Sequence, residues 1–407
     1  MTSNAVQAAP WRSGQVVALI ATLSMLQPLA TDAYLPTLPA IAAAFDAPVA
    51  TAQWTLSAFI AAFAAWQLFA GPLTDRVGRA PVIVGGVATY GLASALCAIA
   101  PGIGWLIAGR VLQAVGACSA LVGVRGLVRD LYPPAEGARL IAGAATFMSL
   151  APLLGPVVGA WLATLFDWRA VFILVTAITA AILFFTGRVL RETNVRRNPH
   201  ALDPGPMLRT YGRVLAHPAF RAYTLAAAAT YGGLFAFLSG SSFVLIRVHG
   251  LTPTLVGYAL ALMVSGYMVG TVLCRRLIAR RGLQHTVYYG AGLQAGAGAV
   301  LGGLALAGVH HPLALIVPMW FFGLSHGVLQ PPVQSGAVAP FPDNAGAAAA
   351  LLGCAMMLVA TAVGAWIGAS YDGTVYPLTL TLAATSLASL LIAHTLVRRD
   401  GDVRHHG

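Results

Sequence analysis

The feature that most constrains this chain is a series of long apolar stretches that follow one another from end to end. Twelve can be counted, each about 20 to 27 residues long, and a helix needs about 20 apolar residues to cross a bilayer. The stretches are continuous, without the alternation that marks the strands of a membrane barrel. The sequence therefore predicts an all-α membrane protein. The stretches lie at about 15–37, 51–70, 81–100, 105–126, 139–164, 169–187, 222–246, 255–274, 285–308, 312–333, 344–370 and 375–396.

Composition excludes the main alternatives. Hydrophobic residues fill 58% of the 407 positions and charged residues only 9%, against roughly 25% charged in an average soluble protein. A soluble globule of this length needs more charge to cover its surface, and a disordered chain is far less hydrophobic. The net charge of +11 comes from arginine alone, because the chain contains no lysine. We interpret this charge as a topology signal and expect the lipid bilayer, not nucleic acid, as its partner.

Arginine is distributed unevenly between alternate loops. If the N-terminus lies inside, the outer loops hold only Arg169 and Arg247. Because basic residues gather on cytoplasmic loops, we expect a multi-pass protein with both termini in the cytoplasm. The inner segments then hold Arg12, Arg76, Arg79, Arg125, Arg129, Arg139, Arg188, Arg191, Arg196, Arg197, Arg209, Arg213, Arg221, Arg275, Arg276, Arg280, Arg281, Arg398, Arg399 and Arg404.

The stretches divide into six, a polar segment, and six. This predicts an N-terminal bundle at 1–187, a cytoplasmic linker at 188–221, and a C-terminal bundle with a tail at 222–407. A weak repeat supports a duplication, since GPLTDRVGR matches RRLIARRGL at a shift of 204 residues and pairs Gly78 with Gly282. Prolines interrupt the linker, so we expect short amphipathic helices on the inner leaflet.

Four segments match known patterns. Residues 71–79 fit GxLxDRxGR at every defined position, and residues 110–116 fit RxxQGxG with alanine for the first glycine. Residues 155–160 fit GPxxGG with alanine at the end, and residues 29–39 read LATDAYLPTLP. Together they resemble the major facilitator superfamily. They are similar in particular to its drug:proton antiporter group with twelve spans, the Bcr/CflA multidrug efflux transporters.

This resemblance implies the major facilitator fold, with twelve transmembrane helices in two six-helix bundles. It also implies a monomer in the bacterial inner membrane that exports small lipophilic or cationic drugs by alternating access. The proton gradient would supply the energy, with no cofactor and no catalytic residue. The antiporter motif would be Gly155, Pro156 and Gly159.

The resemblance assigns a conformational switch to the segment between spans 2 and 3. Its glycines permit tight turns. Asp75 would face a helix N-terminus in the other half, where negative charge is favourable, and Arg76 and Arg79 would reach acids such as Asp130. These contacts would lock the cytoplasmic side shut, whereas the simpler interpretation is that the arginines only set topology. The switch residues are Gly71, Asp75, Arg76, Gly78, Arg79 and Asp130.

Acidic residues are scarce, and Asp32 is the only one of twelve that falls within a span. An ionisable group there is costly and is a functional candidate by default. Counting depth along the helices places Asp32 and Arg110 in the outer half of the bilayer, within one helical turn of each other. We therefore expect proton coupling at this pair, by contact or through water. The alternatives are that Asp32 caps an irregular helix end near Pro36, and that Arg110 extends to the outer headgroups.

A second titratable group, His326, lies near the middle of span 10 and is a further candidate for proton coupling, although the sequence slightly favours a packing role. The drug site is the least constrained, because each aromatic or amide side chain is more often a packing residue. The candidate substrate contacts are Asp32, Tyr34, Gln113, Tyr231, Phe235, Tyr258 and Trp320.

Other classes of protein are disfavoured. An enzyme would need clustered polar groups at the interface, such as HExxH or paired Asp and His, and neither is found. His310-His311 and His405-His406 have no acidic partner at metal-site spacing, so we expect no metal. A channel would need a ring of charge. The remaining alternative is a carrier of the same fold for another solute, such as a sugar, an amino acid or another metabolite.

Overall fold

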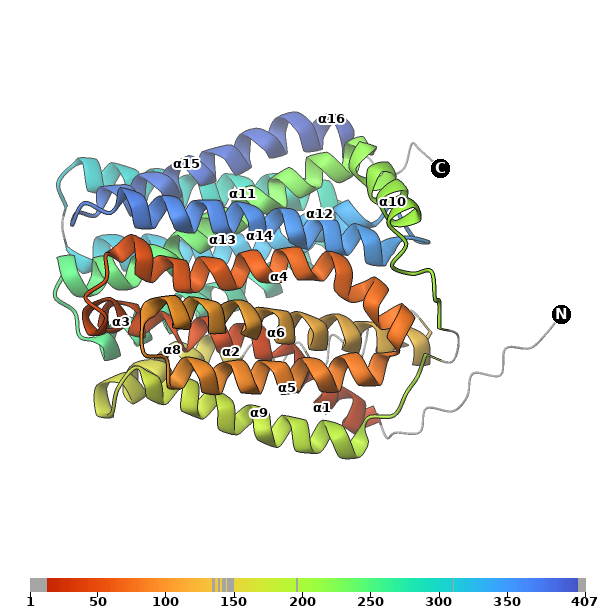
Figure 1. Ribbon diagram of the computed structural model, residues 1–407. Helices are drawn as coiled ribbons and strands as arrows, with labels where there is room; N and C mark the ends of the chain where they lie inside the picture. The colour runs from red at the N-terminus through yellow and green to blue at the C-terminus, as the bar shows by residue number, and fades with distance from the viewer. Residues whose placement is uncertain are drawn as a thin grey trace.

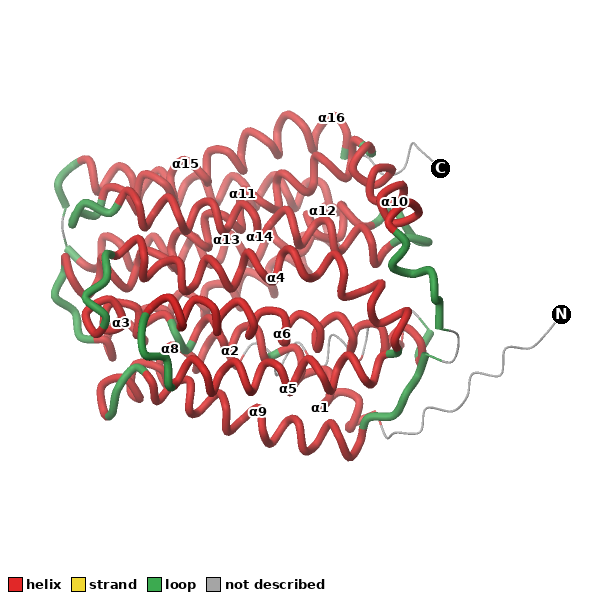
Figure 2. Tube along the Cα trace, in the orientation of Figure 1, coloured by secondary structure: helices red, strands yellow, loops and turns green. Residues whose placement is uncertain are grey.

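The protein is helical from end to end in a computed structural model that describes residues 13–133, 136–137, 140, 144, 150–194, 197–309 and 311–401. No strand occurs in these ranges (Figure 2). Part of the predicted stretch 139–164 lies outside the described residues, as do Arg12, Arg139, Arg196, Arg404, His310, His405 and His406.

Helices long enough to cross a membrane account for the predicted stretches except 139–164, where the structure describes only the 16-residue helix Leu150–Leu165 as a continuous element. The first span is broken into α1 (Ser13–Ser24), α2 (Leu26–Asp32), the 3₁₀ turn η1 (Leu35–Thr37) and α3 (Leu38–Ala44). The breaks after α2 follow the sequence, because Pro36 and Pro39 cannot donate the backbone hydrogen bonds of a continuous helix. The later spans are α4 (Val49–Val77), α5 (Arg79–Ala98), α6 (Ile103–Leu131), α8 (Leu150–Leu165), α9 (Arg169–Val189), α11 (Pro218–Phe243) with η2 (Val244–Val248), α12 (Pro253–Leu306), α13 (Pro312–Val338), α14 (Ala345–Ser370), and α15 (Tyr376–Ile392) with η3 (Ala393–Val397) and α16 (Arg398–Asp400).

Two single-residue turns reveal the internal repeat. The 54 residues of α12 contain two spans, which meet at Gly282 (φ 79°, ψ 174°). Its predicted repeat partner Gly78 (φ 118°, ψ 158°) makes the same kind of break between α4 and α5. Positive φ values favour glycine, which has no Cβ.

The segments expected to be inner loops are therefore helical. Residues 71–77 are the last turns of α4, and residues 275–281 belong to α12. The expectation of loops there was wrong, because in both places the helix continues past the apolar run until a glycine ends it. At 275–281 the four arginines are good helix formers.

The spans form two groups that face each other (Figure 1). The spans up to α9 make one group and those from α11 make the other. The groups meet where α4 contacts α14 and where α8 contacts α12. Small residues bring the first pair close, since Gly364 lies against Ser57 and Gly368 against Gln53. The Gln53 amide also donates a hydrogen bond to the Ser239 carbonyl in the opposite group.

One amphipathic helix, α10 (Pro204–Ala216), connects the two groups. Pro204 occupies its first position, where the missing N–H costs nothing. The side chains of Leu208 and Leu215 are exposed, and the Tyr211 hydroxyl donates a 2.7 Å hydrogen bond to the Leu68 carbonyl of α4. We call the end of the molecule that carries α10 and the Gly78 turn the linker end, and the opposite one the loop end.

Candidate functional site

A cavity of about 260 Å³ lies between the two groups. Span 1 and α8 line it from one side, and α11, α12 and α13 line it from the other. It brings together residues that are far apart in the sequence, among them Asp32, Tyr231, Phe235 and His326. We call it the central cavity.

Asp32 ends α2 and has a side chain with almost no exposed surface. Its Oδ1 accepts a 3.1 Å hydrogen bond from the Thr31 hydroxyl. No ion pair joins it to any residue that the structure describes. Asp32 therefore lies at the irregular end of α2 and lines the central cavity.

The predicted antiporter motif lies directly behind Asp32. A Cβ at Gly155 would lie 3.3 Å from the Asp32 Cβ, and one at Gly159 would collide with the Ala33 carbonyl. On its other side the motif meets the second group, where a Cβ at Gly257 would lie 2.8 Å from the Pro156 carbonyl oxygen. The motif thus packs between the Asp32 segment and α12, and only small residues fit on both faces.

Arg110 is fully buried and supports the backbone of span 1. Its Nη1 donates to the Ala30 carbonyl at 2.9 Å and to Gln113 Oε1 at 2.6 Å, and its Nε donates to the Thr55 carbonyl at 3.1 Å. The guanidinium also lies 4.6 Å from the ring centre of Tyr34. The extension to the headgroups is wrong, because every polar contact holds Arg110 inside the bundle. The expected direct contact with Asp32 is also missing from this conformation.

Two of the aromatic residues expected to contact substrate line the central cavity. These are Tyr231 and Phe235 of α11, and His326 of α13 lines it as well. The His326 ring is nearly buried, with Nδ1 3.0 Å from the Thr230 hydroxyl oxygen.

The other four candidates lie elsewhere. Tyr34 is buried and hydrogen-bonds to the Thr55 hydroxyl, and Gln113 donates to Ser94 at 2.8 Å. Tyr258 is 47% exposed on the outside of α12. Trp320 donates to the Ser265 hydroxyl at 3.1 Å. Residue type alone suggested these four, and none of them lines the central cavity.

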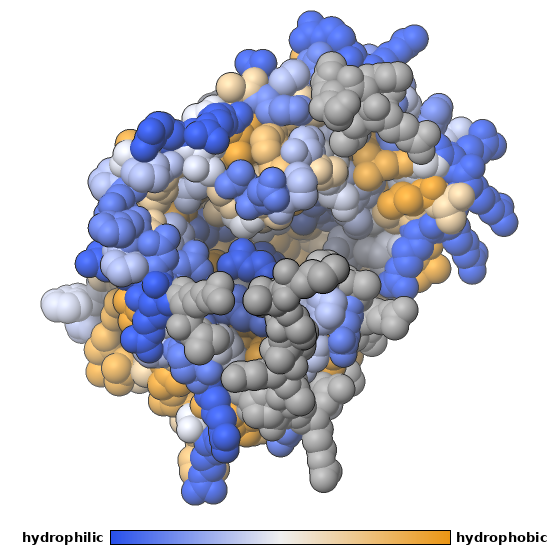
Figure 3. Space-filling view, turned by 90° about the vertical axis from the view of Figure 1, so that its right-hand side faces the viewer, coloured by the Kyte–Doolittle hydropathy of each residue, from blue (hydrophilic) through white to orange (hydrophobic). Residues whose placement is uncertain are grey.

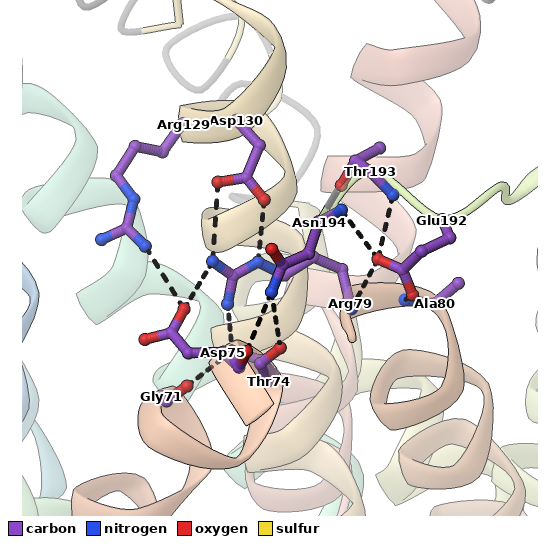
Figure 4. A network of polar contacts seen from close by, with 10 residues as sticks. All are labelled: Gly71, Thr74, Asp75, Arg79, Ala80, Arg129, Asp130, Glu192, Thr193 and Asn194. Carbon is purple, nitrogen blue, oxygen red and sulfur yellow. Dashed lines mark hydrogen bonds and ion pairs between the residues drawn. The ribbon is translucent and has the colours of Figure 1, made fainter. Parts of the chain in front are cut away.

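A second constellation surrounds Arg79 at the linker end (Figure 4). The buried guanidinium lies 2.6 Å from Asp75 Oδ1 and 2.9 Å from Asp130 Oδ2. It also donates to the Thr74 hydroxyl. Arg129 reaches Asp75 from α6 at 3.8 Å. The sequence thus paired Arg79 with Asp130, and the structure adds Asp75 as a second carboxylate partner.

The linker contributes residues that the sequence analysis missed. The Glu192 carboxylate accepts hydrogen bonds from the backbone N–H groups of Arg79 (3.0 Å) and Ala80 (3.3 Å), and so caps the N-terminus of α5. The Asn194 amide donates to the Asp75 carbonyl at 3.0 Å (Figure 4). The partners lie more than 110 residues apart, so no local pattern reveals them.

The predicted lock is not closed in this conformation. Among the described residues, the ion pairs of Asp75 and Arg79 join α4, α5 and α6 of the same group and do not cross to the other group. Arg76 is exposed and has no ion pair within the described part of the chain. Asp75 faces the N-terminus of α14 across a cleft of about 590 Å³.

That cleft opens at the linker end, where a recess bordered mainly by hydrophilic side chains is visible (Figure 3). Arg125 and Arg129 of α6 line one side, and Asp343 and the first residues of α14 line the other. At the loop end the groups are in contact through Gln53, Ser57 and the α14 glycines. The molecule is thus open at the linker end.

Comparisons with known proteins identify the family. The Major Facilitator Superfamily model matches residues 20–396. The chain belongs to the major facilitator superfamily. Relatives include the bicyclomycin resistance protein homolog of Haemophilus influenzae, 27% identical over 93% of this chain and 95% of that protein. The chloramphenicol resistance protein of Pseudomonas aeruginosa is 27% identical over 91% and 89%. The crystal structure of the peptide transporter POT in complex with sulfate, 15% identical, has a TM-score of 0.76 and covers 95% of both chains.

Family membership confirms the predicted resemblance and fold class. The protein is a multi-pass membrane transporter with the major facilitator fold, and it is not an enzyme. Its described residues contain no group of three or more histidine, cysteine or acidic side chains placed to hold a metal ion.

Proposed function

We propose that this transporter is a proton-coupled multidrug efflux antiporter that exports small lipophilic or cationic drugs. The observation that carries the proposal is the position of Asp32 in a cavity between the two groups, where its nearly buried carboxyl group has no ion pair with any described residue. A carboxyl group without a fixed cation can exchange one partner for another. A proton and a drug would compete for it, so that loading one releases the other.

We also propose the membrane arrangement. The linker end, rich in arginine, faces the cytoplasm of a bacterial inner membrane, and residues 1–187 and 222–407 move as two halves about the linker 188–221. This conformation is then inward-facing, and the cleft at the linker end admits substrate. A monomer suffices, because one chain supplies both walls of the central cavity.

The roles of the other candidates follow from their contacts. Arg110 positions the Asp32 segment through the Ala30 carbonyl. The Arg79 constellation holds the first half together while the linker end is open, and its acids become available to α14 when that end closes. His326 is the second group that can titrate in the same cavity.

Transport by purified protein in liposomes tests the proposal. With an imposed pH gradient, wild-type protein should accumulate the lipophilic cation tetraphenylphosphonium, and Asp32→Asn should not. Asp46→Asn is a matched control, because Asp46 is exposed at the loop end beyond α3. Full gradient-driven accumulation by Asp32→Asn would refute the assignment.

A further inference from the structure

The wall of the central cavity opposite Asp32 carries polar side chains that take no part in the proposed proton exchange. On α13, Gln330 and Gln334 follow His326 at intervals of four residues, and all three line the cavity. Residues spaced by four lie on one face of a helix, about 6 Å apart along its axis. Gln330 and Gln334, which we call the amide strip, therefore extend from His326 toward the linker end.

Gln330 is nearly buried but incompletely hydrogen-bonded. Its Nε2 lies 3.6 Å from the Met356 sulfur, which is a weak acceptor. Its Oε1 has no partner among the described residues. A buried amide oxygen without a donor is unfavourable, and such groups are rare in native proteins unless a ligand or water satisfies them. Gln334, by contrast, is exposed at the mouth of the cavity.

The wall that carries Asp32 also has uncharged polar side chains. Gln27 and Thr31 of span 1 line the cavity beside Asp32, and the Tyr231 hydroxyl hydrogen-bonds to Gln27. Among the described residues that line the cavity, Asp32 is the only acidic one, and none is a lysine or an arginine. The cavity thus combines one carboxyl group with several uncharged amides and hydroxyls, a set suited to neutral molecules with hydroxyl or amide groups.

We propose that the amide strip recognises the hydroxyl and amide N–H donors of uncharged substrates, while Asp32 exchanges the proton. This inference rests on the proposed function and adds a substrate class to it. Gln330 is then a specificity-determining residue, because a site built to accept a hydrogen bond discriminates against molecules that lack the donor.

Two probes separate the two roles. Chloramphenicol is uncharged and has hydroxyl and amide N–H donors, whereas tetraphenylphosphonium has none. In proteoliposomes with a pH gradient, Gln330→Leu should raise the apparent KM for chloramphenicol about three- to tenfold, the effect of one hydrogen bond. The KM for tetraphenylphosphonium should stay within about twofold. Gln334→Leu should have a smaller effect on chloramphenicol, because water already competes at its exposed position.

Gln294→Leu is the matched control, because Gln294 is a fully buried glutamine of α12 whose amide also has no partner among the described residues, and it lines neither cavity. It should leave both KM values unchanged. Equal effects of Gln330→Leu on both probes, or none on chloramphenicol, would overturn the inference. If wild-type protein transports tetraphenylphosphonium but not chloramphenicol, the inference fails and the proposed function stands. If the pH gradient drives neither compound, the proposed function itself fails.

Discussion

The carboxylates at the Gly78 turn are paired with arginine, whereas the carboxyl group in the central cavity has no arginine partner among the described residues. At the turn, Asp75 and Asp130 share the buried Arg79 guanidinium, and the linker adds further hydrogen bonds. In the cavity, the only described partner of the Asp32 carboxyl group is the Thr31 hydroxyl, although the buried Arg110 donates a hydrogen bond to the Ala30 carbonyl, two residues away. A carboxylate whose cation is fixed can hold a structure together, whereas one without a cation can exchange its partner. The comparison predicts different responses when each arginine is removed.

The largest effect is expected from Arg110→Ala. The carbonyls of Ala30 and Thr55 and the side-chain oxygen of Gln113 lose their donor, and each loss destabilises the fold by about 1–3 kcal/mol. Removing a buried charge offsets part of this loss. We expect a net loss of about 3 kcal/mol of stability and loss of transport. Thermal unfolding of the purified protein measures the first, and proteoliposome uptake the second.

A double-mutant cycle then tests whether Arg110 pairs with Asp32. If Arg110 only supports the backbone, Arg110→Ala should lower the free energy of unfolding by the same amount in wild-type protein and in Asp32→Asn, within about 0.5 kcal/mol. A coupling above about 1 kcal/mol would show that the two charges do interact.

Arg79→Gln should have the next largest effect, a loss of about 2–3 kcal/mol of stability, because Asp130 loses its cation and Asp75 keeps only Arg129, at 3.8 Å. Arg76→Gln is the control, since Arg76 is exposed and lacks an ion pair in the described chain, and we expect a change below about 0.5 kcal/mol. Equal losses of thermal stability for the two variants would mean that the arginines act only through net charge.

Much of the fold followed from the sequence, because a bilayer allows few solutions. The apolar runs gave the spans, and the pairing of Gly78 with Gly282 located both single-residue turns. The sequence did not indicate which side chains of each span point into the cavity. Tyr34 and Gln113 were therefore expected there, although they do not line it. The amide strip was missed, although the four-residue spacing of His326, Gln330 and Gln334 was a usable signal.

Gly159→Ala tests how tightly the Asp32 segment is held from behind. The added methyl collides with the Ala33 carbonyl, and such overpacking costs about 1–3 kcal/mol. We expect slower transport for Gly159→Ala and a smaller change for Gly155→Ala, whose Cβ would meet its nearest neighbour at 3.2 Å. Gly85→Ala, which meets nothing within 4 Å, should match wild type. Normal uptake rates for Gly159→Ala would show that span 1 moves freely against α8.

Apart from the controls, Glu192→Ala should have the smallest effect. It should lower the free energy of unfolding by about 1 kcal/mol, which is the usual cost of losing a helix N-cap. It removes the acceptor of the first N–H groups of α5 but leaves the ion pairs of Arg79 in place. Protease sensitivity of the linker measures the change. A loss as large as that of Arg79→Gln would mean that the cap and the ion pairs form one unit.

Proton release on drug binding tests the exchange at Asp32 most directly. Tetraphenylphosphonium is added to purified protein in weakly buffered detergent solution, and a pH indicator counts the protons set free. Near neutral pH we expect wild-type protein to release up to one proton per drug bound, and Asp32→Asn to bind drug without releasing any. Equal proton release by the two proteins would contradict the proposal that Asp32 exchanges the proton for the drug.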